Sequence, residues 1–534
     1  MTDSTSPARS MTSADVRSWL ASRSEIAFID VREEGAHGLG HPLLSTSIPY
    51  SRVELEFPYV VPRRAARVVV FDAGDGIAEM AARRLEAIGY SDVHVLERGI
   101  PGWKAAGYEL FESTNVPSKA FAEFVEHECH TPSIGPDELA SMLETKADVA
   151  LLDCRTEEEF ARFHIPGAVS CPGAELVRHF DDVVASKDSL VVVTCAGRTR
   201  GIMGAQSLIN AGVPNRVVAL RGGTPGWLLA SYKLVAGAAP RRDVSPAAQA
   251  SAIARCSEVA CHFGVRMVDC ATFSAWAGDA SRSLHLFDVR TKEEYAKSHR
   301  ENAVHVPGGQ LVHTIDRWVG TRNARVVLTD DASVRAVMTA HWLQQMGWDV
   351  AVLDCDDRKL GIPAREPARL PPVNSVTPAH AAAWMEDGAV ALYVDASAEY
   401  RKAHPKGAIW TNRSILRSLP DSILKAPRIV VHSVDGKLAH LAALDLGEIS
   451  RAEVAVVEGG VNAWRAVGLP VEETPAVPAD PERIDFLFWN HERQLGNHEH
   501  MSSYLHWEAN VLPGQIERDG TAGFRIMSRD FKSS

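Results

Sequence analysis

The chain repeats one pattern four times, and this repetition limits the fold more than any other feature of its 534 residues. Each copy begins with an apolar, strand-like run that ends at an aspartate. The four aspartates are Asp30, Asp153, Asp288 and Asp395. A second run of β-branched residues follows and leads to Asp72, Cys195, Asp330 and Ser433. The separation is 42 residues in the first three copies and 38 in the fourth, so chance similarity explains the pattern poorly.

The rest of each copy indicates the class of fold. A helical pattern follows the second run, and another strand comes after it. Three copies then carry a tryptophan element, at Trp103, Trp227 and Trp464, which the third copy lacks. Short apolar strands that alternate with helices are typical of a parallel sheet with helices on both faces. We therefore predict an α/β fold of four tandem domains, each a mostly parallel sheet flanked by helices, and a short C-terminal helical tail.

Domain boundaries follow from the repeat length of roughly 105 to 120 residues plus linkers. The predicted domains are 8–125, 126–238, 260–368 and 369–476, with a tail of 477–534. The segment Ala236–Ala250 is rich in alanine, proline, arginine and serine, and it is the clearest linker.

Composition excludes several functional classes. The formal net charge is -12, which disfavours a nucleic-acid partner. No stretch is apolar enough to suggest a membrane span, and the polar N-terminus does not resemble a signal peptide. Eight cysteines without a CxxC pair argue against a disulfide framework or a structural zinc site. We expect a cytoplasmic protein that requires no metal and no cofactor.

The second copy alone places a cysteine where the strand turns into the following helix. The turn reads Cys195, Ala196, Gly197, Arg198, Thr199, Arg200 and Gly201. Its backbone N–H groups can curl around the sulfur, and the positive end of the next helix points to the same place. With two arginines nearby, the thiolate is favoured over the thiol. Cys195 is therefore the predicted nucleophile, and the six residues after it are the predicted substrate-binding loop.

With this loop, the chain resembles the rhodanese family, and specifically bacterial proteins with four fused rhodanese domains. The resemblance rests on LLDCRTEEEF, TCAGRTRG and LRGGTPGW and covers about residues 10–475. It implies a thiosulfate sulfurtransferase that carries sulfur as a persulfide on Cys195. The donor would be thiosulfate or a related anion. The acceptor would be cyanide in vitro and a thiol or a thioredoxin-like protein in the cell.

Two other functions remain open. A phosphatase or arsenate reductase would use the same thiolate, but the six-residue loop resembles that of sulfur-transferring rhodaneses. The related phosphatases have seven residues there. A sulfur-carrier or docking protein without turnover is the third hypothesis. A homodimer is also allowed by the sequence.

Residues around the loop have expected supporting roles. Asp153 and Arg155 recur as an Asp-x-Arg motif in copies without the cysteine, so we expect a buried pair that ties the edge of the sheet. Cys154 should point into the core on the opposite face of the strand. Cys171 is either a resolving cysteine or a half-buried bystander, and the bystander is favoured.

The other three copies lack a sulfur nucleophile, because Asp72, Asp330 and Ser433 take its place. We expect these domains to be inactive and to serve in structure, docking or pocket formation. The tail is rich in aromatic residues and holds four histidines: His491, His498, His500 and His506. Aromatic packing is the expected role of the tail, and a metal site there is only weakly supported.

Overall fold

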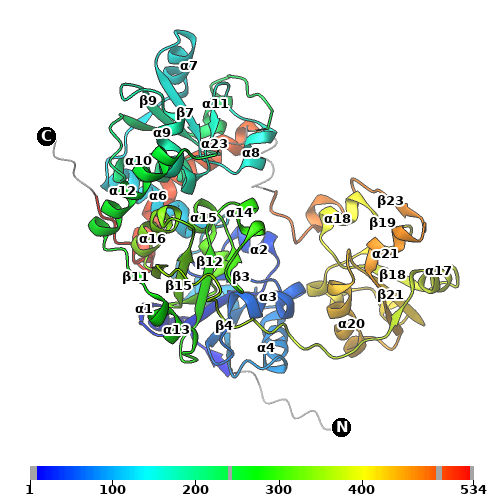
Figure 1. Ribbon diagram of the computed structural model, residues 1–534. Helices are drawn as coiled ribbons and strands as arrows, with labels where there is room; N and C mark the ends of the chain where they lie inside the picture. The colour runs from blue at the N-terminus through cyan, green and yellow to red at the C-terminus, as the bar shows by residue number, and fades with distance from the viewer. Residues whose placement is uncertain (1–8, 239–242, 489–495, 529–534) are drawn as a thin grey trace.

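The computed structural model describes residues 9–238, 243–488 and 496–528, which form four α/β units (Figure 1). Each unit is built on one parallel sheet, and helices cover both faces of it. In the second unit, Val191, Val192 and Val193 are completely buried, as expected for a strand covered on both sides. The predicted fold class is therefore confirmed.

The first two units have the following elements. Unit 1 contains β1 (Arg9–Met11), α1 (Ser13–Ala21), β2 (Ile26–Asp30), α2 (Glu34–Leu39), β3 (Thr46–Ser47), α3 (Val53–Val60), β4 (Arg67–Phe71), α4 (Ile77–Ala87), β5 (Asp92–Leu96) and α5 (Gly99–Ala105). Unit 2 contains β6 (Ser133–Ile134), α7 (Pro136–Glu144), β7 (Val149–Asp153), α8 (Glu157–Arg162), β8 (Val169–Ser170), α9 (Leu176–Val183), β9 (Leu190–Thr194), α10 (Thr199–Asn210), β10 (Val217–Leu220) and α11 (Gly223–Leu229).

The last two units repeat the pattern. Unit 3 contains β11 (Met267–Val268), α13 (Cys270–Ala277), β12 (Leu284–Asp288), α14 (Lys292–Lys297), β13 (Val304–His305), α15 (Gly308–Trp318), β14 (Thr321–Arg322), β15 (Arg325–Thr329), α16 (Val334–Gln345) and β16 (Asp349–Leu353). Unit 4 contains β17 (Ser375–Val376), α17 (Pro378–Glu386), β18 (Val390–Tyr393), α18 (Ser397–Lys402), β19 (His404–Pro405), β20 (Ile409–Trp410), α19 (Asp421–Leu424), β21 (Arg428–His432), α20 (Lys437–Ile449), β22 (Glu453–Val457), α21 (Gly460–Ala466) and β23 (Val471–Glu472).

The five parallel strands of each unit follow the same order, and the sheet of unit 1 gains a sixth, antiparallel strand, β14 of unit 3, beside β2. In unit 2 the order is β6-β10-β9-β7-β8, so the strand that leads to Cys195 lies at the centre. Asp153, the last residue of β7, pairs with Thr194, the last residue of β9. Parallel strands that end together place the residues after them at one edge of the sheet, where open α/β folds bind ligands.

Unit 4 departs from the alignment expected from the sequence. Tyr393 pairs with His432 there, just as Asp153 pairs with Thr194 in unit 2. Tyr393 is therefore the counterpart of Asp153, and Asp395 stands where the other units have arginine. The expected equivalence of Asp395 with the three earlier aspartates was wrong, because the strand ends two residues before it. This shift accounts for two of the four residues by which the spacing in the fourth copy is shorter.

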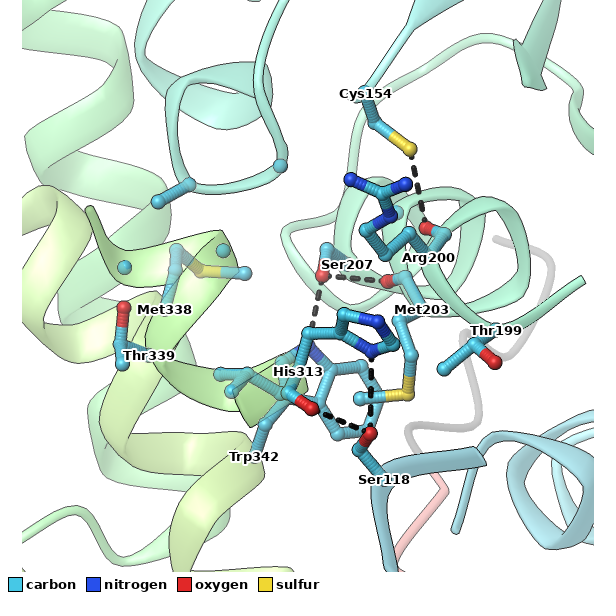
Figure 2. Close-up of a pocket in the computed structure, with 16 residues that line it drawn as sticks. Ser118, Cys154, Thr199, Arg200, Met203, Ser207, His313, Met338, Thr339 and Trp342 are labelled. Atoms are coloured by element: carbon cyan, nitrogen blue, oxygen red, sulfur yellow. Dashed lines mark hydrogen bonds between the residues drawn. The ribbon is translucent and has the colours of Figure 1, made fainter. Parts of the chain in front are cut away.

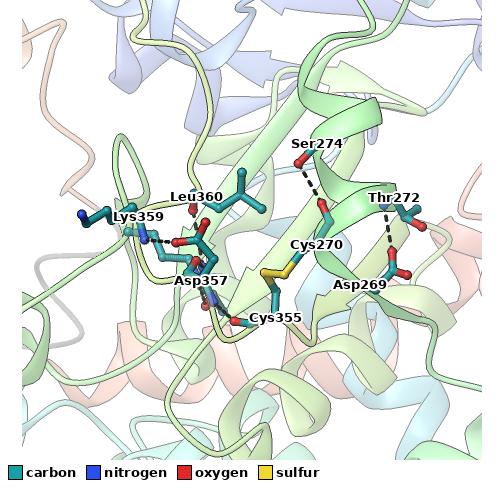
Figure 3. The surroundings of a disulfide bond; sticks show 10 residues. Asp269, Cys270, Thr272, Ser274, Cys355, Asp357, Lys359 and Leu360 are labelled. Carbon is teal, nitrogen blue, oxygen red and sulfur yellow. Dashed lines mark hydrogen bonds between the residues drawn. A yellow bond between two sulfur atoms is a disulfide. The ribbon is translucent and has the colours of Figure 1, made fainter.

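The missing tryptophan of unit 3 is replaced by a disulfide. In the other units, the indole N–H of Trp103, Trp227 or Trp464 donates to a carbonyl oxygen six residues later, at 3.0 Å. Unit 3 instead joins Cys270 at the start of α13 to Cys355 after β16 (Figure 3). The sequence argued against a disulfide framework, yet one disulfide is present, and its two cysteines lie 85 residues apart.

Two segments run through predicted boundaries. The helix α6 (Val116–Glu128) crosses the boundary at 125/126, and α12 (Pro246–Phe263) includes the last part of the expected linker. The tail contributes α23 (His498–His506), a π-helical turn (Trp507–Val511) and α24 (Leu512–Asp519).

None of the described helices combines the length and the hydropathy that a membrane crossing needs.

The units pair in a nested way, unit 2 with unit 3 and unit 1 with unit 4, and unit 3 also contacts unit 1, because its β14 pairs antiparallel with β2. Between units 2 and 3, the buried Arg335 guanidinium lies 3.0 Å from the Glu175 carboxylate. Between units 1 and 4, Arg413 pairs with Glu54 at 2.5 Å, and both side chains are 1% exposed. Figure 1 shows unit 4, in yellow and orange, at one side of the molecule and unit 2 at the other.

Candidate active site at Cys195

Cys195 sits in a tight turn between β9 and α10, and its side chain is 2% exposed. Its carbonyl oxygen accepts the N–H of Thr224 at 2.8 Å. Gly223 permits this close approach, because a Cβ there would lie 2.2 Å from the Cys195 carbonyl oxygen and its φ is +54°. Sequence reasoning missed Gly223 as a site residue. The Gly-Gly pair before the tryptophan element was the signal that could have identified it.

The other three units show what the turn around Cys195 is built to hold. The residue at the same position accepts hydrogen bonds from the backbone N–H groups of its own loop. The pairs are Asp72 with Gly74, Gly76 and Ala78; Asp330 with Ala332, Ser333, Arg335 and Ala336; and Ser433 with Gly436 and Ala439. In every unit the residue six positions after the accepting one donates its backbone N–H to it. In unit 2 this donor is Gly201, which bonds to Cys195. We call this ring of N–H groups the cradle.

Aspartate in the cradle is close in shape to a sulfur-loaded cysteine. Three bonds join Cα to a carboxylate oxygen, and three bonds join Cα to the terminal sulfur of a cysteine persulfide. The carboxylates of Asp72 and Asp330 therefore occupy the region that a persulfide on Cys195 would reach. A cradle that accommodates a carboxylate in two units is suited to an anion of the same reach in the third.

The surroundings of Cys195 favour its thiolate. A hydrogen bond with Cys154 lowers the pKa of the Cys195 thiol most strongly, and Arg200 and the N–H of Gly201 lower it further. Burial and the negative charge of Glu508 oppose this shift. The net result is a pKa below the ordinary value, as a nucleophilic cysteine requires.

Both arginines of the loop are already paired with carboxylates. Arg200 forms two hydrogen bonds with Glu159, at 2.6 and 2.7 Å. Arg198 binds Glu123 on α6 at 2.7 and 2.8 Å and also contacts Glu126. The sequence predicts both arginines as substrate-binding residues, which stays a prediction, and the structure adds that glutamates compensate their charge. The signal was incomplete because Glu123 and Glu126 lie outside the loop motif.

Cys154 lies in the core, as expected, but next to Cys195 and not on the far side of the strand. Its sulfur donates to the carbonyl oxygens of Thr194 at 3.1 Å and Arg200 at 3.3 Å, and it is hydrogen-bonded to Cys195. This bond to Cys195, together with burial, raises the pKa of Cys154 well above its ordinary value. Cys154 is therefore a neutral donor beside the thiolate.

Cys171 is more deeply buried than the half-exposed position expected for it. Its side chain is 2% exposed, and its N–H donates to the carbonyl oxygen of Asp153 at 2.8 Å. It packs in the core shared by units 2 and 3. A resolving role for Cys171 stays a prediction.

Asp153 and Arg155 lie at the sheet edge beneath the loop. The guanidinium binds both carboxylate oxygens, at 2.7 to 3.1 Å, and reaches the carbonyl oxygen of Phe163 at 2.6 Å. Both side chains are at most 1% exposed. The same pair occurs as Asp30 with Arg32 and as Asp288 with Arg290. Its presence in units without the cysteine is in line with the expected structural role.

A small cavity lies between the site and unit 3 (Figure 2). Its volume is about 50 Å³, and Cys154, Thr199 and Arg200 line one side of it. His313 and Trp342 of unit 3 line the opposite side. A second cavity of about 140 Å³ shares Cys154 and continues along the same interface. Unit 3 therefore forms a wall over the region next to the nucleophile.

No group of three or more His, Cys, Asp or Glu side chains in the described part of the chain is arranged to hold a metal ion. Of the tail histidines, His498, His500 and His506 lie on α23. His491 and Trp489 lie outside the described residues.

Comparison with known proteins identifies the family. The model of the Rhodanese-like domain matches residues 12–106, 135–230 and 273–356, which together make up about half of the chain. Unit 4, where Tyr393 and Ser433 replace the usual residues, lies outside these ranges. A crystal structure described as thiosulfate sulfurtransferase from Pseudomonas aeruginosa is 41% identical, with a TM-score of 0.92. The match covers 97% of this chain and 100% of that one.

Smaller solved structures match single units only. The BH2092 protein from Bacillus halodurans is 20% identical, covers 21% of this chain and 80% of its own, and has a TM-score of 0.19. A rhodanese-related protein from Thermoplasma volcanium is 24% identical, with coverages of 20% and 97% and a TM-score of 0.17. No curated protein matches the sequence. On the family model and the full-length match, the chain belongs to the family of proteins built from rhodanese-like domains.

Proposed function

We propose that the protein is a sulfurtransferase that carries a sulfur atom as a persulfide on Cys195. The donor is thiosulfate or a related sulfane-sulfur compound, and the acceptor is a thiol in the cell or cyanide in vitro. The full-length similarity to a protein described as a thiosulfate sulfurtransferase supports this assignment. The transfer is assigned to unit 2, because Cys195 is the cysteine at the turn and the other units have Asp72, Asp330 and Ser433 there.

The observation that carries the proposal is the cradle. Its N–H groups hold carboxylate oxygens in units 1 and 3, which are as many bonds from Cα as the terminal sulfur of a persulfide would be. The same arrangement around Cys195 would stabilise a negatively charged sulfur without any reorganisation.

The reaction takes place in two displacements. The Cys195 thiolate attacks the outer sulfur of thiosulfate, the S–S bond of the donor breaks, and sulfite leaves with the electron pair. The terminal sulfur of the new persulfide is then held by the cradle. An acceptor thiolate attacks that sulfur, and the Cys195 thiolate is restored. Sulfite is a stable anion, so the leaving group needs no proton.

A phosphatase or arsenate reductase is the weaker candidate. In that chemistry, the guanidinium of the loop must be available to bind the oxyanion in the transition state. Here Arg200 is held by Glu159 and Arg198 by Glu123 and Glu126. These pairings favour sulfur chemistry over phosphoryl transfer at this site.

Intact-mass measurement after incubation with thiosulfate tests the proposal. We expect a gain of about 32 Da, one sulfur atom, in the wild type and none in Cys195→Ser. Addition of cyanide should then remove the added mass and release thiocyanate. The Cys195→Ser variant should also lose sulfur transfer by on the order of a thousandfold or more, because serine is a poor nucleophile without an adjacent base.

Three other outcomes would change the proposal. An equal mass gain in both proteins would assign the persulfide to another cysteine, with Cys171 the next to be tested. A gain that cyanide and thiols remove only slowly would favour a sulfur carrier that delivers to a specific protein. A complete lack of gain, together with hydrolysis of a phosphate ester, would favour the phosphatase.

A further inference from the structure

The tail reaches the active site from outside the repeats. Its helices α23 and α24 pack on unit 1 and on α6, in a cluster formed by Leu43, Phe111, Val116, Ala120, Tyr504, Trp507, Leu512 and Ile516. Arg17 of unit 1 anchors the far end of α24 through Asp519, at 2.8 Å. At the near end, Leu505 and Tyr504 pack against Gly222 and Gly197 of unit 2. The tail therefore spans the distance from unit 1 to the Cys195 loop.

Glu508 is the tail residue that contacts the loop through a charge. It lies in the π-helical turn between α23 and α24, and it is completely buried. Its Oε1 accepts the hydroxyl of Thr199 at 2.5 Å. Its Oε2 is buried without a hydrogen-bond partner among the described residues and lies 3.6 Å from the place a Cβ would take on Gly197. A buried carboxylate with one unsatisfied oxygen is costly to keep unless it has a function.

Glu508 forms no ion pair with any described residue, although its charge acts on Arg198 and helps to raise the pKa of that guanidinium. The groups that face the thiol are Arg200, paired with Glu159; Arg198, paired with Glu123 and Glu126; Cys154; the Asp153–Arg155 pair; and Glu508. Lys119 lies over the rings of Tyr504 and Trp507 and donates to Ser113. Burial, together with the charges of Glu508 and Glu126, raises the pKa of Glu123 to about 7, although the pair with Arg198 lowers it.

We propose that Glu508 is a positioning residue of the Cys195 loop, which holds Thr199 in place and sets a negative charge against the cradle. This inference rests on the proposed function of Cys195. The hydrogen bond fixes the first residue of α10, which contributes to the shape of the cradle. The negative charge of Glu508 weakens the binding of anions in the cradle.

Two consequences follow for the reaction. The negative charge makes the Cys195 thiolate less stable than the cradle alone would make it, so the sulfur becomes a better nucleophile once it is deprotonated. The same charge repels a doubly negative donor such as thiosulfate and limits its binding. Glu508 thus lowers the affinity of a site that would otherwise bind the thiosulfate anion and stabilise the persulfide too strongly.

The first test measures the titration of Cys195 independently of any sulfur transfer. The rate of its alkylation by iodoacetamide is followed as a function of pH by peptide mass spectrometry. In Glu508→Gln, the amide oxygen still accepts the Thr199 hydroxyl, but the charge is gone. We expect the pH at the midpoint of the Cys195 alkylation profile to fall by roughly one unit. At a pH below both midpoints, alkylation should be about threefold faster than in the wild type, because about tenfold more thiolate is partly offset by its weaker nucleophilicity.

Glu517→Gln is the matched control, because Glu517 is exposed on the same tail and its substitution changes the net charge equally. Its midpoint should equal that of the wild type. Glu508→Ala serves as a second variant and should show the same fall. A midpoint that does not change in either Glu508 variant, with both proteins folded by thermal melting, would overturn the proposal.

The second test uses thiosulfate kinetics. In Glu508→Gln, we expect KM for thiosulfate to fall by about threefold to tenfold, with a smaller change in kcat, while Glu517→Gln keeps both. An unchanged or higher KM in a folded, active variant would overturn the charge role. If the wild type has no activity with thiosulfate at all, the proposed function fails, while the alkylation profile still tests the role of Glu508.

Discussion

The loops of units 2 and 3 are built alike but cannot do the same chemistry. In unit 2, Arg200 pairs with Glu159, and in unit 3, Arg335 pairs with Glu294 at the corresponding positions. In both loops the N–H of the sixth residue on, Gly201 or Ala336, is hydrogen-bonded to the residue after the central strand. That residue is Cys195 in one loop and Asp330 in the other. The arginine–glutamate pair therefore belongs to the architecture of the loop, and the identity of a single side chain separates a nucleophile from a filled cradle.

The most drastic way to test this comparison is to exchange that side chain. We expect Asp330→Cys, made in a Cys195→Ser background, to regain the mass increase of about 32 Da with thiosulfate that Cys195→Ser lacks. The reason is that the N–H groups that now bind the Asp330 carboxylate would stabilise the new persulfide. Asp330→Ser in the same background is the control and should gain nothing. If Asp330→Cys also gains nothing, access to the loop of unit 3 separates the two units as much as the residue does.

A second prediction compares the stability that Arg335 and Arg200 contribute. Arg335 is completely buried and contacts Glu175, Glu294 and Asp331 at 2.5 to 3.0 Å. Its substitution by methionine leaves these three carboxylates to share Arg178, which lies 3.4 to 3.9 Å from them, so we expect a loss of about 3–5 kcal/mol in the free energy of unfolding. Arg200→Met removes one partner from Glu159 alone and should cost less. Denaturant unfolding of both variants measures the difference, and equal losses would show that the two pairs are energetically equivalent.

The smallest expected effect concerns the disulfide that only unit 3 has. Cys270→Ser opens a loop of 85 residues, and we expect it to lower the free energy of unfolding by about 2–4 kcal/mol. A reductant should lower the stability of the wild type by the same amount and leave that of Cys270→Ser unchanged. Retained wild-type stability in the variant would mean that the carbonyl contacts of Arg300 with the same segment suffice.

Local patterns predicted the fold well, and they located the turn at which Cys195 stands, while its role as nucleophile stays a prediction. The apolar runs identified the strands, and the residue after the second run identified Cys195, because both depend on neighbours in sequence. Spacing alone misplaced Asp395, since a strand that ends two residues early leaves no mark in the pattern of apolar residues. The ion pairs of Arg198 and the contact of Glu508 could not be predicted. Their partners come from α6 and from the tail, 72 to 309 residues away, and no periodicity connects them.

The nested pairing of the units has a consequence for synthesis of the chain. Tyr50 and Glu54 of unit 1 are buried against Arg413 and Asp445, and Tyr50 and Asp445 are separated by 395 residues. At roughly 5–20 residues per second, a ribosome needs about 20–80 s to make the intervening chain. During this time units 2 and 3 can complete their own interface, while unit 1 must keep an unmatched carboxylate surface exposed to water. The N-terminal unit is thus the first to be made and the last to acquire its full set of contacts.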